Sequence, residues 1–435
     1  MPRKKSPPKT LFSRSKEILG LTAKIITKEV SHRVSQKVDR ITHQIDQAQA
    51  MVETLSSLKG AAMKAGQWIV LEARDYLPPE VIQVLSQLQD KGSHMDISDV
   101  NEIIKKELSQ ESSALIQSLS PEPIGSASIG QVHKATYRGE SIALKVQFPG
   151  IAESIDSDLS LMGKVVTTMT GLTGKKINFA PLLEELRIVL KQEVDYKQEL
   201  KLAHRYRELL KHDTRFVVPK VYPELSSSRI IALEWIEGKR FTDWIQTQPP
   251  LHHREHISKL LIDLYCMEFY DWGLVQTDPN PANFLIIETD SLPKLAVLDF
   301  GATLEYTAEF KREYIELLCV IEGGKREEIF QTASKFGFID PRESEDTQNL
   351  FNKLMDVSVE PFRKDLQPFH FGNIDYAKRV RDSVIEFAKK VKFSSPPKKL
   401  IFINRKLGGV FNIIKMLDVK LDLVPYWNRM KNTKT

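Results

Sequence analysis

The stretch Gln276–Gly301 reads QTDPNPANFLIIETDSLPKLAVLDFG and decides how the rest of the chain is interpreted. Two short apolar runs, 284–287 (FLII) and 295–298 (LAVL), lie on either side of a Ser-Leu-Pro turn and predict a β-hairpin. Such a hairpin would bring Asn283, which precedes the first run, and Asp299, which follows the second, to the same end.

Asp278 stands five residues before Asn283, which is the D-x-x-x-x-N spacing of a protein-kinase catalytic loop, and Asp299 begins a D-F-G. In that chemistry Asp278 orients the attacking hydroxyl or accepts its proton. The amide oxygen of Asn283 and the carboxylate of Asp299 hold Mg2+ against the nucleotide phosphates. Each motif alone arises easily by chance, because D-F-G is short and Asp-Pro-Asn-Pro is a turn signal. Their order, with strands between them, favours a catalytic site.

The whole chain has 435 residues, is 41% hydrophobic and 27% charged, and is long enough for two or three domains. Its two cysteines, Cys266 and Cys319, are too few for a disulfide framework or a Cys-based zinc site, and they fit a reducing compartment. No apolar run approaches the roughly 18–20 residues of a membrane span. The net charge is only +5, but the basic residues are unevenly placed.

Residues 1–41 form a basic amphipathic segment, with eleven Lys and Arg against three acidic residues before residue 41. A helix of this kind can lie on an anionic membrane surface. It can also be an organelle transit peptide, or pack on the domain as an ordinary solvated helix. The protein is therefore expected to be cytoplasmic and peripherally membrane-associated, or to reside in the mitochondrial matrix if 1–40 is a transit peptide.

Residues 42–95 predict a helical extension, because apolar residues between 42 and 75 recur at steps of three and four until Pro78-Pro79 ends the pattern. This helix contains Lys64-Ala65-Gly66-Gln67. A glycine costs roughly 1 kcal/mol relative to alanine inside a helix. The close approach of another backbone or of a ligand would explain the glycine.

Residues 96–236 carry the parts of a nucleotide-binding lobe. Lys145 lies on a predicted strand whose alternate residues 142, 144 and 146 face the other way. A loop of small residues comes before it and consists of Gly125, Ser126, Ala127 and Ser128. A phosphate-covering loop followed by a strand lysine is the layout of a kinase first lobe. The run 229–238 would be its last strand and the linker that meets adenine, with Glu234 and Ile236 at that position.

Residues 180–212 predict one long helix that bears three acids. Asp195 and Glu199 would lie on one face, whereas Glu193 would point elsewhere. One acid can hold Lys145 and another a second lysine, although a charged solvated helix face is the alternative. Residues 237–435 predict a helical second lobe with the catalytic loop, and its late run 405–409 (RKLGG) predicts a turn without a chemical role.

These parts together resemble the UbiB (AarF) atypical kinase family, which includes coenzyme Q biosynthesis kinases, from about residue 45 to near the C-terminus. The run 64–67 is similar to the family's K-x-G-Q signature, 193–195 (EVD) to its E-x-D signature, and 125–128 stands where the family has an Ala-rich loop. The resemblance implies an α+β, two-lobed protein-kinase-like fold. Its helical N-terminal extension carries the K-x-G-Q motif and lies across the active site.

The family resemblance also implies roles for individual residues. Lys145 would pair with the phosphates and be held by Glu199. Lys64 would reach toward Glu193 and restrain the site, with Gln67 beside the nucleotide.

The implied cofactors are ATP or ADP and Mg2+, and the implied activity is ATPase or small-molecule phosphotransfer that supports ubiquinone or related membrane-lipid metabolism. The implied partners are the nucleotide, an anionic membrane surface and quinone-pathway lipids or enzymes, without nucleic acid. A conventional protein kinase and a nucleotide-gated scaffold are the alternatives. The chain departs from the family at Gly125-Ser126, which leaves ATP against ADP open, and at Gln276 and Asn280, where the family often has histidines.

Overall fold

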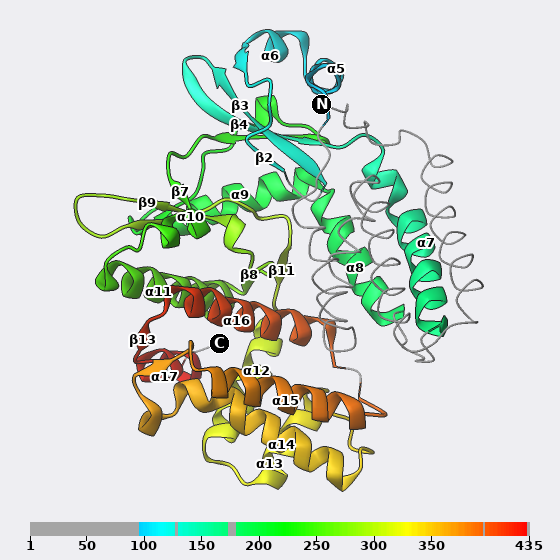
Figure 1. The fold of residues 1–435 in the computed structure, drawn as a ribbon, viewed down its shortest axis with the longest axis vertical. Coiled ribbons are helices and arrows are strands. Elements are labelled where there is room, and N and C mark those ends of the chain that lie inside the picture. Colours follow the sequence, from blue (N-terminus) through cyan, green and yellow to red (C-terminus); the bar gives the residue numbers. More distant parts are fainter. Residues whose placement is uncertain (1–94, 127–128, 173–179, 395, 433–435) are drawn as a thin grey trace, which may run out of the picture. The chain divides into compact units, whose positions relative to one another are not determined.

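The computed structural model describes four stretches of the chain: residues 95–126, 129–172, 180–394 and 396–432. These residues divide into two compact units that interleave along the sequence. The first unit takes the described residues up to His204 together with Lys220–Trp235, and the second takes Arg205–Pro219 and the residues from Ile236 onward. Each unit contains its own sheet and helices, which Figure 1 labels in chain order.

The described residues of the first unit form a five-stranded antiparallel sheet in the order β1-β3-β4-β6, with β2 beside β3. Its strands are β1 (Ile116–Leu119), β2 (Gly125–Ser126), β3 (Gly130–Tyr137), β4 (Glu140–Gln147) and β6 (Ile230–Glu234). β3 and β4 form a hairpin whose turn residues, Arg138 and Gly139, both have positive φ, as a tight two-residue turn requires. Ile142, Leu144 and Val146 are all buried on one face of β4, so the predicted alternation is confirmed.

The described residues of the first unit form the helices α5 (Ile97–Glu107), α6 (Gln110–Ala114), α7 (Ile151–Leu172), α8 (Ala180–Glu193) and the first part of α9 (Tyr196–Leu210), with a 3₁₀ turn, η2 (Pro223–Leu225). The apolar side of α5 packs into the same core as the sheet, through Val100, Ile103 and Ile104. This packing follows from the spacing of the three residues, which places them on one side of a helix.

The single helix predicted over 180–212 is wrong, because the chain leaves helical conformation between α8 and α9. Asp195 lies just before α9, and its Oδ1 accepts a hydrogen bond from the backbone N of Gln198 (3.0 Å). A short acidic side chain that satisfies a first-turn N–H in this way favours a helix start over helix continuation. Asp195 therefore shares no helix face with Glu199.

The described residues of the second unit form a four-stranded sheet in the order β5-β10-β9-β7 and two short strand pairs. The strands are β5 (Phe216–Val217), β7 (Lys239–Arg240), β9 (Phe284–Ile287) and β10 (Lys294–Val297), with β8 (Leu274–Gln276) paired to β11 (Thr303–Glu305) and β12 (Phe369–His370) to β13 (Lys420–Leu421). β9 and β10 are antiparallel, with Phe284 opposite Val297. The predicted hairpin is confirmed.

The helices of the second unit are α10 (Phe241–Gln246), α11 (Leu251–Cys266), α12 (Ala308–Gly323), α13 (Arg326–Lys335), α14 (Glu345–Val359), α15 (Ile374–Lys390), α16 (Lys398–Leu417) and α17 (Val424–Asn432). Its short helical turns are the π-helical η3 (Met267–Trp272) and the 3₁₀ turns η4 (Pro281–Asn283), η5 (Glu360–Phe362) and η6 (Lys364–Leu366). α16 runs beside α11 (Figure 1).

The turn predicted at 405–409 is wrong, because these residues lie in the middle of α16. Ile403, Val410, Ile414 and Leu417 recur at helical spacing and are all buried. Burial of this apolar side outweighs the low helix propensity of two consecutive glycines.

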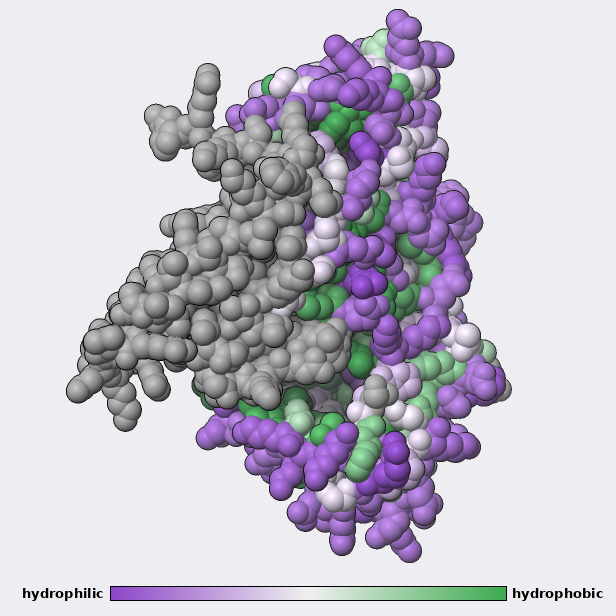
Figure 2. All heavy atoms as spheres, turned by 90° about the vertical axis from the view of Figure 1, so that its right-hand side faces the viewer, coloured by the Kyte–Doolittle hydropathy of each residue, from purple (hydrophilic) through white to green (hydrophobic). Residues whose placement is uncertain are grey.

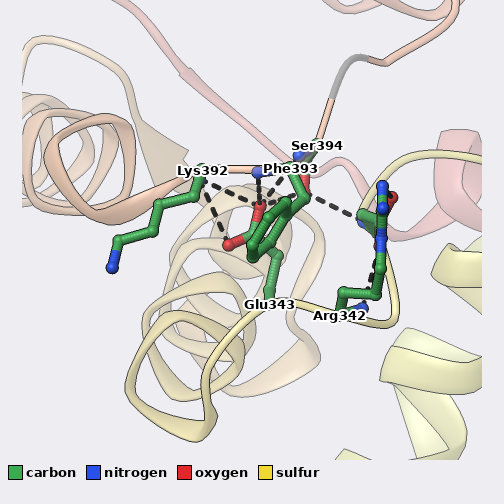
Figure 3. A network of polar contacts seen from close by, with 6 residues as sticks. Arg342, Glu343, Lys392, Phe393 and Ser394 are labelled. Carbon is green, nitrogen blue, oxygen red and sulfur yellow. Dashed lines mark hydrogen bonds and ion pairs between the residues drawn. The ribbon is translucent and has the colours of Figure 1, made fainter.

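A buried carboxylate fastens the start of α14 to the segment that follows α15. Glu343 is 4% exposed, and its Oε1 accepts hydrogen bonds from the backbone N of Phe393 (2.8 Å) and from both the N and Oγ of Ser394 (2.8 Å each). The backbone N of Lys392 donates to both carboxylate oxygens (3.1 and 3.2 Å). Figure 3 shows the carboxylate pointing into this ring of donors, which replaces water for a buried charge.

The surface of the described residues is mostly polar on the face drawn in Figure 2, with hydrophobic areas between the charged side chains. No helix of the described residues is long and apolar enough to cross a membrane.

Candidate active site

The loop between β8 and β9 contains Asp278 and Asn283. Asn283 Nδ2 donates hydrogen bonds to the backbone carbonyl of Asp278 (3.1 Å) and to its Oδ2 (3.3 Å). Asn280 closes the turn, since its side-chain oxygen accepts a hydrogen bond from the backbone N of Ala282 (3.0 Å). Asn283 is buried and Asp278 is half-buried. The loop therefore fixes the amide and leaves the carboxylate partly open.

Asp299 follows the end of β10, directly after the residue that pairs with the catalytic loop. The backbone N of Leu298 donates to the carbonyl of Asn283 (3.0 Å), so the hairpin brings Asn283 and Asp299 to one end. Asp299 Oδ1 accepts a hydrogen bond from the backbone N of Gly301 (3.0 Å). Within the described residues, no group of three or more His, Cys, Asp or Glu side chains could hold a metal ion. A Mg2+ at Asn283 and Asp299 would therefore need phosphate oxygens or waters as its other ligands.

The strand pair β8–β11 ties the catalytic loop to the segment after Asp299. Both the backbone N and Oγ1 of Thr277 donate to the carbonyl of Ala302, at 2.8 and 2.7 Å. Phe300 is fully buried, and its ring centroid lies 4.9 Å from that of Tyr206. The catalytic loop and the D-F-G segment are thus held together by strand pairing and by aromatic packing.

In the first unit, Lys145 on β4 forms an ion pair with Glu199 on α9. Its Nζ lies 2.9 Å from Oε1 and 3.1 Å from Oε2 of the carboxylate. The ammonium also lies 5.1 Å from the ring centroid of Tyr196, within the range of a cation–π contact. Glu199 is 3% exposed and Lys145 is 15% exposed. The carboxylate is buried, whereas the lysine is partly exposed. This arrangement is the one expected of a lysine that contacts a ligand.

The small-residue loop is described only in part. Gly125 and Ser126 form β2 and pair with β3, while Ala127 and Ser128 lie outside the described residues. At Gly130, where β3 begins, an added Cβ would collide with the backbone of β4 and with a side chain of α9. A glycine is therefore required where this loop returns to the sheet.

Glu234 and Ile236, predicted at the adenine-binding linker, differ in their surroundings. Glu234 Oε2 accepts a hydrogen bond from the backbone N of Lys220 (2.9 Å), and the backbone N of Glu234 donates to the carbonyl of Lys220 (2.8 Å). Ile236 is half-buried and is the first residue of the second unit after the linker. The Glu234 side chain therefore helps to hold the strand against the segment that contains Lys220.

The other predicted site residues are placed as follows. Glu193 is the half-buried last residue of α8, and Asp195 is exposed between the two helices. Lys64 and Gln67, with the basic segment 1–41, lie outside the described residues.

A buried charged pair that the sequence did not predict lies behind the catalytic loop. Lys406 Nζ lies 3.0 Å from Glu268 Oε2, and these side chains are 2% and 1% exposed. Lys406 Nζ also donates to Gln276 Oε1 (3.4 Å), two residues before Asp278. Burial raises the pKa of Glu268, and the Lys406 ammonium opposes that shift. The only sequence signal for this pair is that Lys406 stands at helical spacing between the apolar residues Phe402 and Val410.

Comparison with known proteins gives a consistent set of relatives. The ABC1 atypical kinase-like domain matches residues 87–333. The chain is 30% identical to "Atypical kinase coq-8, mitochondrial" of Caenorhabditis elegans, over 84% of this chain and 48% of that protein. It is 29% identical to "Atypical kinase COQ8, mitochondrial" of Saccharomyces cerevisiae, over 86% of this chain and 72% of that protein. The chain thus spans about half the length of the first of these relatives.

Among solved structures, a complex of Rv3197 with erythromycin from Mycobacterium tuberculosis matches with a TM-score of 0.60 and 25% sequence identity. The match covers 89% of this chain and 97% of that chain. The α+β, kinase-like fold expected from the sequence is confirmed by this match together with the domain match.

Proposed function

This chain belongs to the family of ABC1 atypical kinase-like domains, also called UbiB or AarF, and we propose that it is an atypical kinase or ATPase that binds a Mg-nucleotide. The observation that carries the proposal is the hairpin β9–β10. It joins Asn283 to Asp299 at one end, while Asn283 holds Asp278 through its amide nitrogen. Kinase-type phosphotransfer uses this combination of one orienting carboxylate with an amide and a second carboxylate.

The donor set fits a magnesium ion. Asn283 uses its amide nitrogen within the loop, and its amide oxygen accepts no hydrogen bond from the described residues. Mg2+ in nucleotide sites commonly takes one or two protein oxygens and completes its octahedron with phosphates and water. In this proposal Asn283 and Asp299 hold the ion, which offsets phosphate charge when bound. Asp278 orients the attacking hydroxyl or accepts its proton.

In this proposal Lys145, which belongs to the first unit, binds the nucleotide phosphates. Glu199 holds its ammonium by both carboxylate oxygens, so the lysine is fixed before a ligand arrives. A fixed, partly exposed cation binds phosphate with little ordering cost. We assign Lys145 to the nucleotide phosphates and Glu199 to positioning that lysine.

The biological role proposed here rests on the family. We propose that the activity supports ubiquinone or related membrane-lipid metabolism, with quinone-pathway lipids or enzymes and an anionic membrane surface as partners. Relatives from C. elegans and S. cerevisiae are named as mitochondrial. This supports the mitochondrial matrix, with 1–40 as a transit peptide, over a peripheral cytoplasmic location.

The test is the thermal shift that Mg-ATP produces in the Asp299→Asn variant. Loss of the carboxylate should remove the Mg2+-dependent part of the shift, because an amide is a weaker ligand for a hard cation. Asp290→Asn is the matched control, since Asp290 is exposed at the opposite end of the same hairpin and should leave the shift intact. A full Mg2+-dependent shift in Asp299→Asn would mean that the metal binds elsewhere.

A further inference from the structure

Helix α16 touches the catalytic loop at a point where only a glycine fits. A Cβ added at Gly409 would overlap Cβ and Cγ of Pro279, the residue that follows Asp278. At the neighbouring Gly408, an added Cβ would meet nothing within 4 Å. The two glycines therefore differ in their surroundings. The missing side chain of Gly409 lets the helix backbone lie directly against the loop, whereas Gly408 has free space beside it.

One turn earlier on the same side of α16, Lys406 reaches the other end of the loop. Residues three positions apart on a helix are neighbours on one face, so Lys406 and Gly409 form a single contact surface. The Lys406 ammonium bonds to Gln276 Oε1 (3.4 Å). The helix thus contacts residues on both sides of Asp278: Gln276 before it and Pro279 after it.

Gln276 depends on Lys406 for its orientation. Its side chain is buried, and its Nε2 finds no hydrogen-bond acceptor among the described residues. The bond from Lys406 is the side-chain contact that selects the direction of the amide. A buried amide with one satisfied atom is costly, so its retention behind Asp278 points to a role other than stability.

The same network continues from Lys406 to the D-F-G segment. Lys406 pairs with Glu268, and the Tyr206 hydroxyl lies 3.0 Å from Glu268 Oε1 and 3.0 Å from the carbonyl of Leu274 in β8. The Tyr206 ring packs on Phe300 of the D-F-G. One buried lysine therefore connects both segments that carry the candidate catalytic groups.

We propose that α16 positions the catalytic loop for turnover, with Gly409 and Lys406 as positioning residues that act on either side of Asp278. The proposal rests on the proposed function for the meaning of turnover, but the support of the loop by α16 stands on the contacts alone. A buried ion pair adds little stability relative to a well-packed apolar pair, and in this proposal the Lys406–Glu268 pair acts by holding the loop in one arrangement.

The experiment compares Gly409→Ala with Gly408→Ala in Mg-nucleotide hydrolysis. Both changes favour the helix by about 1 kcal/mol in propensity, so a difference between them reports on the loop. Because a displacement of about 1 Å can cost about 100-fold in rate, we expect Gly409→Ala to lower kcat by about that factor with little change in KM. Gly408→Ala should retain the wild-type kcat. Equal kcat values in the two variants would overturn the proposal.

A double-variant cycle separates positioning from a general loss of stability. Pro279→Gly removes the atoms that the new methyl group would overlap. Adding Gly409→Ala to Pro279→Gly should therefore cost much less in kcat than adding it to the wild type. Full additivity of the two effects would show that Gly409 does not act through Pro279, and it would overturn the proposal.

Hydrogen exchange of the peptide that spans 276–284 distinguishes a failure of this inference from a failure of the proposed function. We expect faster amide exchange in Gly409→Ala than in Gly408→Ala, because α16 no longer supports the loop. If the wild type hydrolyses no nucleotide, the proposed function fails, while this exchange difference still supports the positioning role. Identical exchange in the two variants would overturn the role whatever the activity.

Discussion

Two lysine–glutamate pairs in this chain have nearly the same N–O distance but very different burial. Lys145 and Glu199 in the first unit lie 2.9 Å apart, and the lysine is 15% exposed. Lys406 and Glu268 in the second unit lie 3.0 Å apart, and the lysine is 2% exposed. The first lysine can meet a ligand from solvent, whereas the second can meet only the protein.

Burial, rather than pairing, is what differs between the lysine proposed to bind phosphate and the lysine proposed to support the loop. A sealed ammonium cannot exchange its carboxylate for a phosphate, so Lys406 is fixed to Glu268 and Gln276. The ammonium of Lys145 is partly exposed, whereas its acid Glu199 is buried. The variants described below test this division in order of their expected effect on stability.

Lys406→Met should have the largest effect. It leaves the Glu268 carboxylate buried without its cation, and breaking such a pair typically costs about 3–5 kcal/mol. Urea unfolding should show a loss of that size in the free energy of unfolding. Lys415→Met, an exposed position on the same helix, should stay within about 0.5 kcal/mol of the wild type.

Adding Glu268→Gln to Lys406→Met should recover part of the lost stability, since the uncompensated charge is then gone and an amide oxygen can still accept from Tyr206. A Lys406→Met variant as stable as the wild type would show that Lys406 does not compensate the Glu268 charge. The two lysines would then not differ in the way described above.

Glu343→Gln sharpens the comparison, because this buried carboxylate is compensated by backbone donors rather than by a lysine. Burial would raise the pKa of Glu343, but the hydrogen bonds from Phe393, Ser394 and Lys392 outweigh it and hold that pKa below its ordinary value of 4.5. Glu343 therefore contributes stability that is present above pH 4.5 and lost as the pH falls through its lowered folded-state pKa.

The variant should lose about 1–3 kcal/mol at neutral pH, the usual cost of weakening hydrogen bonds to a buried charged group. Its stability should also fall less steeply than that of the wild type below pH 4.5. Unfolding measured between neutral and acid pH checks both results. If the stability of the variant fell as steeply below pH 4.5 as that of the wild type, another carboxylate would be responsible for the loss of stability in acid.

Lys145→Met should have the smallest effect on stability and a large one on binding. Because the ammonium of Lys145 borders solvent, water can take its place beside Glu199 in the variant, and we expect a loss of about 1 kcal/mol. Nucleotide binding measured by calorimetry should be largely lost, while Lys197→Met, an exposed control on α9, should bind normally. Normal binding by Lys145→Met would show that Lys145 does not meet the nucleotide.

The parts of the fold and candidate site that the sequence predicted are the local ones. Alternation of apolar residues placed Lys145 on the outer side of its strand, and two apolar runs around a turn gave the hairpin that joins Asn283 to Asp299. In each case the pattern lies within a few residues of the group it positions.

The parts that failed depend on competing or distant interactions. The break before α9 had a local signal, because Asp195 followed by Gln198 is a capping pattern, but the helical segments on both sides of it favour one continuous helix. No local pattern indicated the partners of Lys406 and Gly409. Their partners Gln276 and Pro279 lie about 130 residues earlier, and no spacing rule connects them.

The distance along the chain between Gln276 and Lys406, 130 positions, also has a consequence for synthesis. Contacts between residues so far apart form late, since the intervening chain must first be ordered. On the ribosome, the β9–β10 hairpin emerges well before α16, so the loop that carries Asp278 is made without the helix that braces it. The proposed activity should therefore be absent from the nascent protein until translation has passed Leu417 and α16 can pack on the loop.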